Sequence, residues 1–466
     1  MELSFEFESA WKQAEDKNYL KDMMSYADGY KDFISKAKTE RIAVKELLKM
    51  AKDNGYVSLE EKMKAGNISA GDKVYSINRD KGIAMFVIGE KSLEEGMRIV
   101  GGHIDSPRLD LKQNPLYEDT DMSYLKTHYY GGIRKYQWTT IPLAIHGVAF
   151  LSDGSRVDIC IGEDESDPVF CVTDLLPHLA SKQNAKTLGD GVEGEALNIL
   201  IGSQPLEGED KESVKKNILK LLNEKYNIVE RDFLCAEIEV VPAGDARDLG
   251  LDRSMLIGYG QDDRVCSYAA VQAILSLGKE VPKYTAVALC VDKEEVGSQG
   301  NTGMQSRFFE DVVAELIALQ GDYSDLKIRR SMSNTKVLSA DVAAGYDPNY
   351  ADVYEKRNSA ILGHGLVVNK YTGAKGKSGC NDANAEFLAE LRKVFDDNDV
   401  VWQTAELGKV DAGGGGTIAF ILANANAEVV DCGVGVLSMH SPYEVTSKVD
   451  IYEAFKGYKA FMKSAF

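Results

Sequence analysis

The sequence predicts an α/β protein in which a sheet lies between layers of helices, and three observations lead to this fold class. Short apolar runs typical of buried strands alternate with segments whose apolar residues recur at helical spacing, most clearly after residue 254. Polar residues of chemical interest follow these runs directly, where open α/β sheets bind their ligands. With 466 residues, 44% of them apolar, the chain can form two or three domains with a large core.

The N-terminal part is predicted to be helical and then strand-rich. The first 66 residues are charged, and Ile42–Asn54 places apolar residues at helical spacing before Gly55. Strands are expected at Lys73–Ile77, Gly82–Ile88 and Arg98–Val100, the last of which leads into Gly-Gly-His.

The chain changes character between residues 108 and 249. Strands are expected there at Ile141–Leu151, Val157–Ile161 and Val169–Val172, and a charged helix at Lys211–Lys225. We predict an inserted domain at 108–249, so that the catalytic domain is discontinuous and built from 1–107 and 250–466.

Strands and helices alternate again after the insertion. Helices are expected at Arg264–Leu277 and Cys380–Phe395, and strands at Tyr284–Val291 and Lys336–Ala340. The segments 419–422 and 428–432 are also apolar and complete the set.

Composition excludes several classes of partner. Acidic residues outnumber basic ones by 73 to 54, and a net charge of −19 disfavours binding to nucleic acid or anionic membranes. The seven cysteines are widely spaced without a Cys-x-x-Cys pair, which predicts reduced thiols. The N-terminal residues lack the pattern of a signal peptide, and no apolar run approaches the roughly 18 residues of a membrane span. We therefore expect a cytoplasmic protein.

Five loops that follow apolar runs carry histidines and carboxylates. They are GGHIDSP with His103 and Asp105, GYGQDDRV with Asp262 and Asp263, VDKEEVGSQG with Glu294 and Glu295, LSADVAAG with Asp341, and VLSMHSP with His440. Each has a commoner explanation by itself, such as a helix N-cap for the Asp pair or a solvated surface for the Glu pair. Two histidines and several carboxylates together are a typical ligand set for zinc, manganese or cobalt.

The residues in these loops suffice for a dinuclear site. A metal pair about 3.5–4 Å apart needs one bridging carboxylate and roughly two further ligands for each ion. The predicted ligands are His103, Asp262, Glu295, Asp341 and His440, with Asp262 as the bridge.

Two further carboxylates are predicted to assist the metal ligands. Glu294 precedes the ligand Glu295, so it can face a water molecule and act as the general base. Asp105 lies two residues after His103 in an extended segment, on the same side, where it can hold the ring nitrogen that the metal leaves unused.

The motifs resemble those of a known family. GGHIDSPRLDLK, GYGQDDRV, DKEEVGSQG, SADVAAGYDPNY and VLSMHSPYEV occur in the order found in the aspartyl aminopeptidase family of dinuclear-zinc metallopeptidases, and the resemblance covers nearly the whole chain. It implies a three-layer sandwich with a mixed sheet of the zinc-peptidase type, two Zn²⁺ per subunit (Co²⁺ or Mn²⁺ as alternatives) and the residue roles given above. It also implies that the β-rich insertion is a dimerisation domain and that dimers build a tetrahedral dodecamer.

The resemblance adds one catalytic residue from the insertion. The segment 176–180 (LPHLA) is similar to a Pro-His-Leu motif of the family, whose histidine reaches the active site of a neighbouring subunit. It implies that His178 acts in trans and stabilises the tetrahedral intermediate.

The sequence departs from the family at two places. Two histidines that commonly follow the Asp ligand are replaced by Ala344 and Asp347, neither of which is a primary ligand position. The family's acid-selecting lysine falls at Asn369 or Lys370, a choice that the sequence leaves open. The preference for acidic, neutral or basic N-terminal residues therefore stays open as well.

The expected activity is removal of one residue from the free N-terminus of a peptide, by a metal-bridged hydroxide with Glu294 as the base. One alternative on the same metal frame is an acyl-amino-acid deacylase or a deblocking peptidase, which would not require a free α-amino group. Another is a non-catalytic self-assembling particle, which the complete set of ligand positions disfavours.

Overall fold

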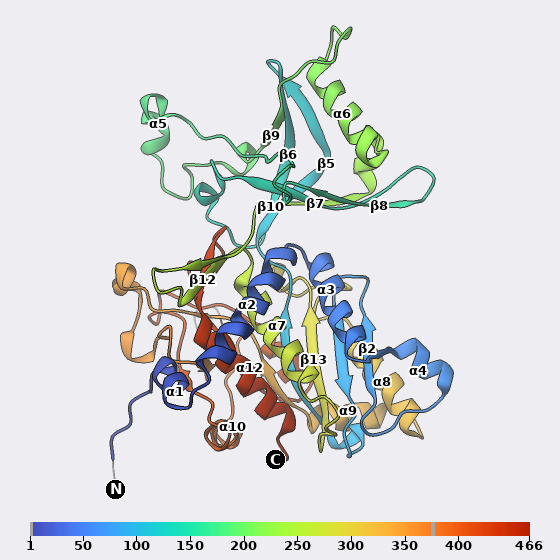
Figure 1. Ribbon diagram of the computed structural model, residues 1–466, viewed down its shortest axis with the longest axis vertical. Coiled ribbons are helices and arrows are strands. Elements are labelled where there is room, and N and C mark those ends of the chain that lie inside the picture. Colours follow the sequence, from blue (N-terminus) through green and yellow to red (C-terminus); the bar gives the residue numbers. More distant parts are fainter. Residues whose placement is uncertain (1–2, 374–377) are drawn as a thin grey trace. The chain divides into compact units, whose positions relative to one another are not determined.

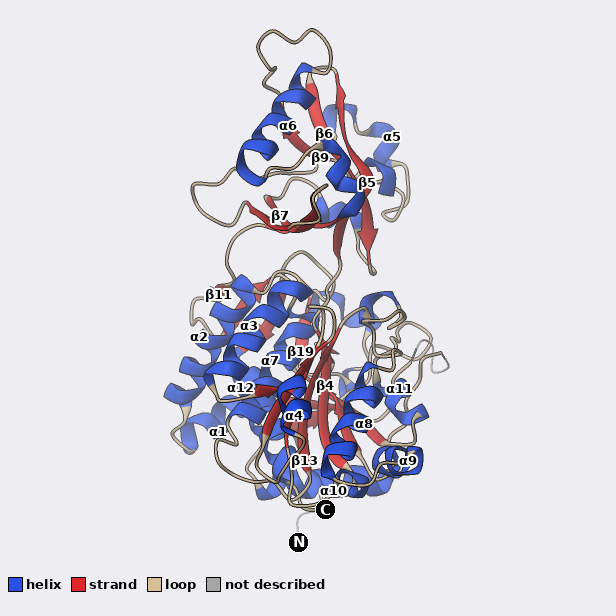
Figure 2. Cartoon of the chain, turned by 90° about the vertical axis from the view of Figure 1, so that its right-hand side faces the viewer, coloured by secondary structure: helices blue, strands red, loops and turns tan. Residues whose placement is uncertain are grey.

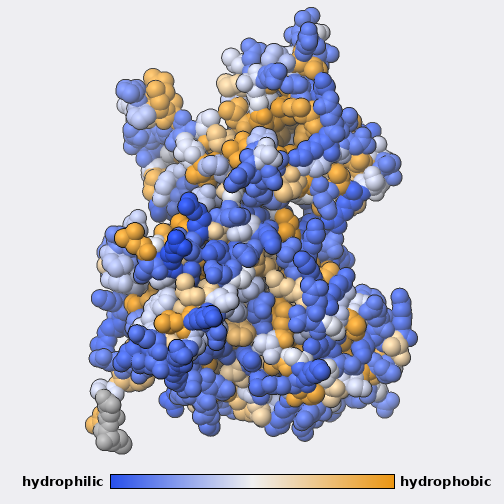
Figure 3. Space-filling model, in the orientation of Figure 1, coloured by the Kyte–Doolittle hydropathy of each residue, from blue (hydrophilic) through white to orange (hydrophobic). Residues whose placement is uncertain are grey.

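The computed structural model describes residues 3–373 and 378–466, and the chain divides into two compact units (Figure 1). Unit 1 comprises Met1–Asp105, Ala246–Met439 and Glu444–Phe466, and unit 2 comprises Ser106–Asp245 and His440–Tyr443. Within the described residues, no helix is both long enough and apolar enough to cross a membrane. The face of the molecule in Figure 3 is mainly hydrophilic, as expected from 127 charged residues, 54 basic and 73 acidic.

Unit 1 is built around a nine-stranded mixed sheet with the strand order β1-β2-β3-β13-β4-β14-β18-β16-β17. The strands are β1 (Val57–Ser58), β2 (Lys73–Ile77), β3 (Ile83–Val87), β4 (Met97–His103), β13 (Thr285–Val291), β14 (Lys336–Ser339), β16 (Leu366–Asn369), β17 (Trp402–Thr404) and β18 (Glu428–Gly433). The neighbours β13, β4, β14 and β18 are parallel, so their carboxyl ends lie at one edge of the sheet.

Helices cover both faces of this sheet (Figure 2). Because side chains alternate along a strand, Ala286 and Ala288 of β13 enter one hydrophobic cluster and Val287 and Leu289 enter another. The first cluster includes residues of α2 (Leu20–Lys36), α3 (Glu40–Asp53), α7 (Gln261–Leu275), α10 (Ala385–Asp397) and α12 (Lys448–Lys463). The second includes residues of α4 (Leu59–Ala65), α8 (Phe308–Gln320), α9 (Asp325–Ser333) and α11 (Ala419–Asn424). Unit 1 also contains α1 (Ala10–Asp16), which packs with α2 and α12.

A second, smaller sheet of unit 1 follows the order β11-β12-β20-β19-β15. Its strands are β11 (Arg247–Leu249), β12 (Met255–Gly258), β15 (Ala343–Ala344), β19 (Gly435–Leu437) and β20 (Glu444–Ser447). Two loops of unit 1 that carry motif residues adjoin this sheet, because Asp341 precedes β15 and Asp262 follows β12. In the sequence, residues 440–443 of unit 2 lie between β19 and β20.

Unit 2 contains an antiparallel six-stranded sheet with the order β8-β7-β10-β5-β6-β9. The strands are β5 (Arg108–Asp119), β6 (Met122–Tyr130), β7 (Leu143–Phe150), β8 (Arg156–Ile161), β9 (Ile199–Gly202) and β10 (Ala236–Pro242), and the helices are α5 (Ser181–Asn184) and α6 (Ser213–Tyr226). Val214 of α6 and Ile199 of β9 are fully buried in this unit.

The α/β class with mixed sheets is confirmed, and two expected elements are wrong. The segment 169–172 forms no named strand, because its residues make only isolated bridges, to Thr139, Leu143 and Leu200. The helix expected from Cys380 begins at Ala385 instead, because Asn384 takes an extended conformation (φ −66°, ψ 140°) and acts as its N-cap.

Candidate metal centre

The site in unit 1 lies at the carboxyl edge of the parallel strands. β4 ends at His103, and its partner in register is Val291, the last residue of β13. Glu294 and Glu295 follow β13 in the short helix η6 (Glu294–Val296), and Asp341 follows the end of β14 by two residues. Parallel pairing therefore brings together residues that are up to 238 positions apart, 103 and 341.

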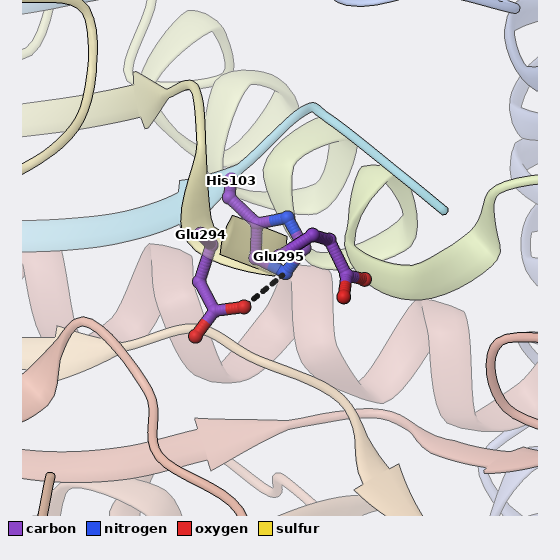
Figure 4. Close-up of side chains that lie close together, drawn as sticks. All are labelled: His103, Glu294 and Glu295. Atoms are coloured by element: carbon purple, nitrogen blue, oxygen red, sulfur yellow. Dashed lines mark ion pairs between the residues drawn. The ribbon is translucent and has the colours of Figure 1, made fainter. Parts of the chain in front are cut away.

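The two ring nitrogens of His103 face different partners. Nδ1 lies 3.3 Å from Oδ1 of Asp105 and 3.1 Å from its carbonyl oxygen. Nε2 lies 3.2 Å from Oδ1 of Asp262, 3.8 Å from Oδ1 of Asp341 and 4.0 Å from Oε2 of Glu294. The last pair is drawn in Figure 4. An imidazole that donates from Nδ1 to Asp105 turns the lone pair of Nε2 toward these carboxylates, the arrangement of a metal-binding histidine.

Asp105 also fixes the position of the two glutamates. Its Oδ1 accepts a hydrogen bond from the backbone N–H of Glu294 (3.1 Å), and its Oδ2 accepts one from Glu295 (3.2 Å). Asp105 is completely buried. One carboxylate thus couples the orientation of His103 to the helix that carries Glu294 and Glu295.

Asp262 and Asp263 lie at the start of α7, in a part of the backbone that is not helical. The peptide bond between them is cis. The backbone N–H of Asp262 donates to Oε2 of Glu444 (3.1 Å), and Oδ2 of Asp263 accepts from the backbone N–H of His103 (3.3 Å). Asp262 therefore presents its carboxylate to His103, whereas Asp263 holds the backbone of β4.

The potential ligand atoms form tight groups. One atom each from His103, Glu294 and Glu295 lies within 4.8 Å of the others, and the same holds for His103, Asp263 and Asp341. Asp263 was not among the predicted ligands, and the sequence did not single out Glu444, which is 1% exposed. Its position within the last motif (HSPYE) was the available signal.

The charges of this cluster suit a divalent cation. Burial raises the pKa of Glu294 to about 8, and burial also raises the pKa of Asp341. The pKa of His103 is raised well above its ordinary value, because hydrogen bonds to Asp105, Asp262 and Asp341 outweigh the opposing effect of burial. Several buried carboxylates around one imidazole leave an excess of negative charge, which a bound cation neutralises.

Two predicted residues belong to unit 2. His440 lies in the loop between β19 and β20, with Nδ1 2.9 Å from the carbonyl oxygen of Gly132. A hydrogen bond from Nδ1–H to this oxygen leaves the lone pair on Nε2, as a metal ligand requires. His178 lies in the exposed helix η3 (Pro177–Leu179).

The two replaced family positions lie in unit 1. Ala344 ends β15, and Asp347 accepts a hydrogen bond from the backbone of Asn349 at the start of η7 (Pro348–Val353).

Comparison with known proteins identifies the family. Residues 33–462 match the family model for aminopeptidase I zinc metalloprotease (M18). A probable M18 family aminopeptidase 1 from Clostridium acetobutylicum is 58% identical over 461 residues, which cover 98% of each chain. The chain belongs to the M18 family of zinc metallopeptidases. This M18 aminopeptidase is therefore a hydrolase, and the resemblance noted in its motifs is confirmed.

Solved structures agree with this assignment. The M18 aminopeptidase of Thermotoga maritima superposes with a TM-score of 0.94 at 44% identity, over 99% of this chain and 100% of that chain. Aminopeptidase I from C. acetobutylicum gives a TM-score of 0.91 at 53% identity, with the same coverage. The S. cerevisiae mApe1 dodecamer is 20% identical and covers 94% of this chain and 96% of that chain, with a TM-score of 0.75, which is a likeness of fold.

Proposed function

We propose that this M18 aminopeptidase removes one residue at a time from peptides with a free N-terminus, with two zinc ions in each subunit. The proposed ligands are His103, Asp262, Glu295, Asp341 and His440, with Asp262 as the bridge. The observation that carries the proposal is the buried cluster in which Nε2 of His103 faces the carboxylates of Asp262 and Asp341 at 3.2 and 3.8 Å. When bound, the metal pair would lower the pKa of a water molecule and polarise the scissile carbonyl.

In this proposal Glu294 is the general base. Its carboxylate lies in the cluster, 4.0 Å from Nε2 of His103, while its backbone N–H is held by Asp105. It takes a proton from the attacking water and delivers the proton to the leaving amine. Asp105 acts through His103 and the helix η6, so it is a positioning residue.

We further propose that Asn369 governs the side-chain pocket instead of Lys370. Nζ of Lys370 donates a hydrogen bond to Oδ1 of Asp382 (2.6 Å). In contrast, Oδ1 of Asn369 is buried and has no hydrogen-bond partner among the described residues. Asn369 is paired across the sheet with the buried Asp431. A neutral carboxamide beside a carboxyl group disfavours an acidic side chain, so we expect a preference for neutral or basic N-terminal residues.

The remaining family features are part of the same proposal. The helices on both faces of the nine-stranded sheet would form the three-layer sandwich of zinc peptidases, and unit 2 would be the inserted dimerisation domain. We propose a tetrahedral dodecamer in which His178 serves a neighbouring subunit; the mApe1 dodecamer shares this fold. The cytoplasmic location stays a prediction.

The test is hydrolysis of a panel of aminoacyl-p-nitroanilides and their N-acetylated counterparts by the metal-depleted and the zinc- or cobalt-loaded enzyme. We expect metal-dependent cleavage of the free-amine substrates alone, with neutral or basic residues preferred. Cleavage of the acetylated substrates would move the protein to the deacylase or deblocking class. Faster cleavage of the Asp and Glu substrates would contradict the role given to Asn369.

A further inference from the structure

A cysteine, a histidine and a glutamate form a second cluster of reactive side chains, entirely within unit 2. Cys160 of β8 is directly opposite His146 of β7 in an antiparallel pair. Opposite residues lie on the same face of a sheet with their Cβ atoms about 4.5–5.5 Å apart. Cys160 is exposed, whereas His146 is 2% exposed. The imidazole therefore lies beneath a thiol that solvent can reach.

The hydrogen bonds of His146 fix the orientation of its ring. Nε2 lies 2.8 Å from Oε1 of Glu163, and the other carboxylate oxygen of Glu163 accepts from the backbone N–H of Gly244 (3.1 Å). Nδ1 is buried and has no hydrogen-bond partner among the described residues. An imidazole that donates from Nε2–H to Glu163 carries its lone pair on Nδ1, and Cys160 is the side chain that faces this nitrogen.

The residues around His146 favour the protonated, positively charged form of its imidazole. Burial lowers the pKa of His146, but Cys160 and Glu163 outweigh burial and raise the pKa above its ordinary value. On the other side of His146, the buried Glu239 of β10 is its partner in register. Glu239 is paired with Arg108, whose Nη2 lies 3.5 Å from its Oε1. Glu163 and Cys160 are therefore the groups that favour a protonated ring.

The backbone N–H and carbonyl groups of Cys160 are both held by one side chain. The hydroxyl of Tyr226, at the end of α6, donates to the carbonyl oxygen of Cys160 (2.7 Å) and accepts from its N–H (3.3 Å). The backbone of Cys160 is therefore held in place, although β8 is the outermost strand of the sheet.

We propose that Cys160 is a site of thiol modification, activated by His146, with Glu163 as the residue that positions the ring. The ligand class is a small-molecule disulfide. The proton of Cys160 moves to Nδ1 of His146, and the thiolate attacks one sulfur of the disulfide. The S–S bond of the small molecule breaks, a new S–S bond to Cys160 forms, and the departing thiolate takes the proton from His146. Cys160 is oxidised and half of the small molecule is reduced, so no further oxidant is needed.

Unit 2 contains a second exposed cysteine that serves as a reference for the reactivity of Cys160. Cys235 is also exposed, at the end of the helix η5 (Glu230–Cys235) and outside the sheet. A free cysteine with an ordinary pKa near 8.5 is only a few per cent thiolate at pH 7, so ion-pair formation raises its reaction rate about tenfold or more. Cys160 and Cys235 can therefore be compared in one sample.

The experiment measures labelling of each cysteine in the full, metal-loaded enzyme at pH 7, with iodoacetamide and separately with bis(2-hydroxyethyl) disulfide, by peptide mass spectrometry. We expect Cys160 to react about tenfold faster than Cys235. His146→Gln should reduce the rate at Cys160 to that at Cys235 and leave Cys235 unchanged, and Glu163→Gln should give an intermediate rate. The aminopeptidase activity and the unfolding temperature of each variant show that it has folded.

Equal rates at the two cysteines in the unmodified protein would overturn the proposal. A rate at Cys160 that survives His146→Gln, or a Cys160 that stays unlabelled in the assembled enzyme, would overturn it as well. The readout is independent of the metal centre, so failure of the proposed peptidase mechanism and failure of this proposal are distinguishable.

Discussion

His103 would determine the geometry of the proposed metal centre, because its two ring nitrogens face different partners. The carboxylate of Asp105 lies beside Nδ1 of His103 and also accepts hydrogen bonds from the backbone N–H groups of Glu294 and Glu295. A single buried carboxylate thus sets the tautomer of one proposed ligand and the position of another. The adjacent pair Glu294 and Glu295 can then have separate roles, proton transfer and metal binding, because consecutive side chains point in different directions.

Glu294→Gln separates these two roles. We expect the variant to keep both zinc ions but to lose activity, since general base catalysis contributes about 10²–10⁴-fold and acts here on a metal-activated water. Zinc content by mass spectrometry and kcat with a free-amine p-nitroanilide are the measurements. Glu310→Gln, an exposed glutamate in the first turn of α8, is the control. Turnover near the unmodified rate would remove Glu294 from the mechanism, and loss of zinc would instead make it a ligand.

At the scale of elements, the position of His103 depends on Gly102. Because Gly102 has no side chain, β4 can approach Asp263 and Ala340 closely just before His103. A Cβ atom at Gly102 would lie 2.5 Å from Oδ2 of Asp263 and 2.7 Å from the carbonyl oxygen of Ala340. The preceding Gly101 points to the opposite face, where the nearest atom to a Cβ would be 3.5 Å away, in Ile418. The two glycines therefore form a matched pair with different steric demands.

We expect Gly102→Ala to destabilise the fold by about 1–3 kcal/mol, as overpacking does, and to weaken zinc binding, because Asp263 and His103 must move. Gly101→Ala should bind zinc and hydrolyse substrate at close to the unmodified rate. Urea unfolding and zinc titration of both variants test this difference. Equal zinc affinities would show that β4 tolerates displacement at the site.

The helix α12 offers a test of pH dependence away from the metal ligands. Asp450 is buried, and its carboxyl oxygens accept hydrogen bonds from the backbone N–H groups of Gly363 and Gly365, both at 2.7 Å. Burial raises the pKa of Asp450 to about 8. A raised folded-state pKa favours the protonated form, so its contribution to stability is present below the unfolded value of about 4 and is lost as the pH rises through 8.

Asp450→Asn removes this titration. We expect the free energy of unfolding of the unmodified protein, relative to the variant, to decrease between pH 5 and pH 8. Urea unfolding at several pH values measures the difference. A difference that does not change with pH would mean that the two N–H donors keep Asp450 ionised throughout.

How far the sequence predicts these elements depends on the environment of each strand. β13 is buried on both faces and forms a continuous apolar run, so its bounds were expected almost to the residue. The hairpin of β5 and β6 was not expected, because β5 carries Lys112 and Asn114 and its pairing shifts register between Leu111 and Leu116. Neither feature gives the regular alternation that identifies a strand.

The proximity of the candidate residues was easier to predict than the strands around them. The loops that follow apolar strands could be located without knowing the strand order, and parallel pairing then brings His103, Glu294 and Asp341 together. Asp263 and Glu444 act on the backbone of His103 and Asp262. Such contacts join distant segments, so the sequence motifs contained both residues without indicating these roles.

At the scale of the whole molecule, the proposed metal centre connects segments that are distant in sequence. Asp262, Glu295 and Asp341 come from separate loops of unit 1, and the repulsion between Asp262 and Asp341 in a buried site opposes folding, which a bound cation would offset. A ligand that binds only the folded state stabilises it by RT ln(1 + [L]/Kd), about 4 kcal/mol at a thousandfold excess over Kd. Metal binding and stability are therefore expected to be linked.

Removal of zinc by a chelator should lower the unfolding temperature, and added zinc should restore it. Glu295→Gln should reduce this shift because it removes a proposed ligand, whereas Glu294→Gln should preserve the shift because the base does not hold the metal. Differential scanning calorimetry of the chelated and reloaded forms of all three proteins gives the comparison. If the unmodified protein unfolds at the same temperature with and without zinc, a bound cation does not stabilise the fold against repulsion between the buried carboxylates. In that case their protonation alone would relieve the repulsion, as the raised pKa values of Glu294 and Asp341 allow.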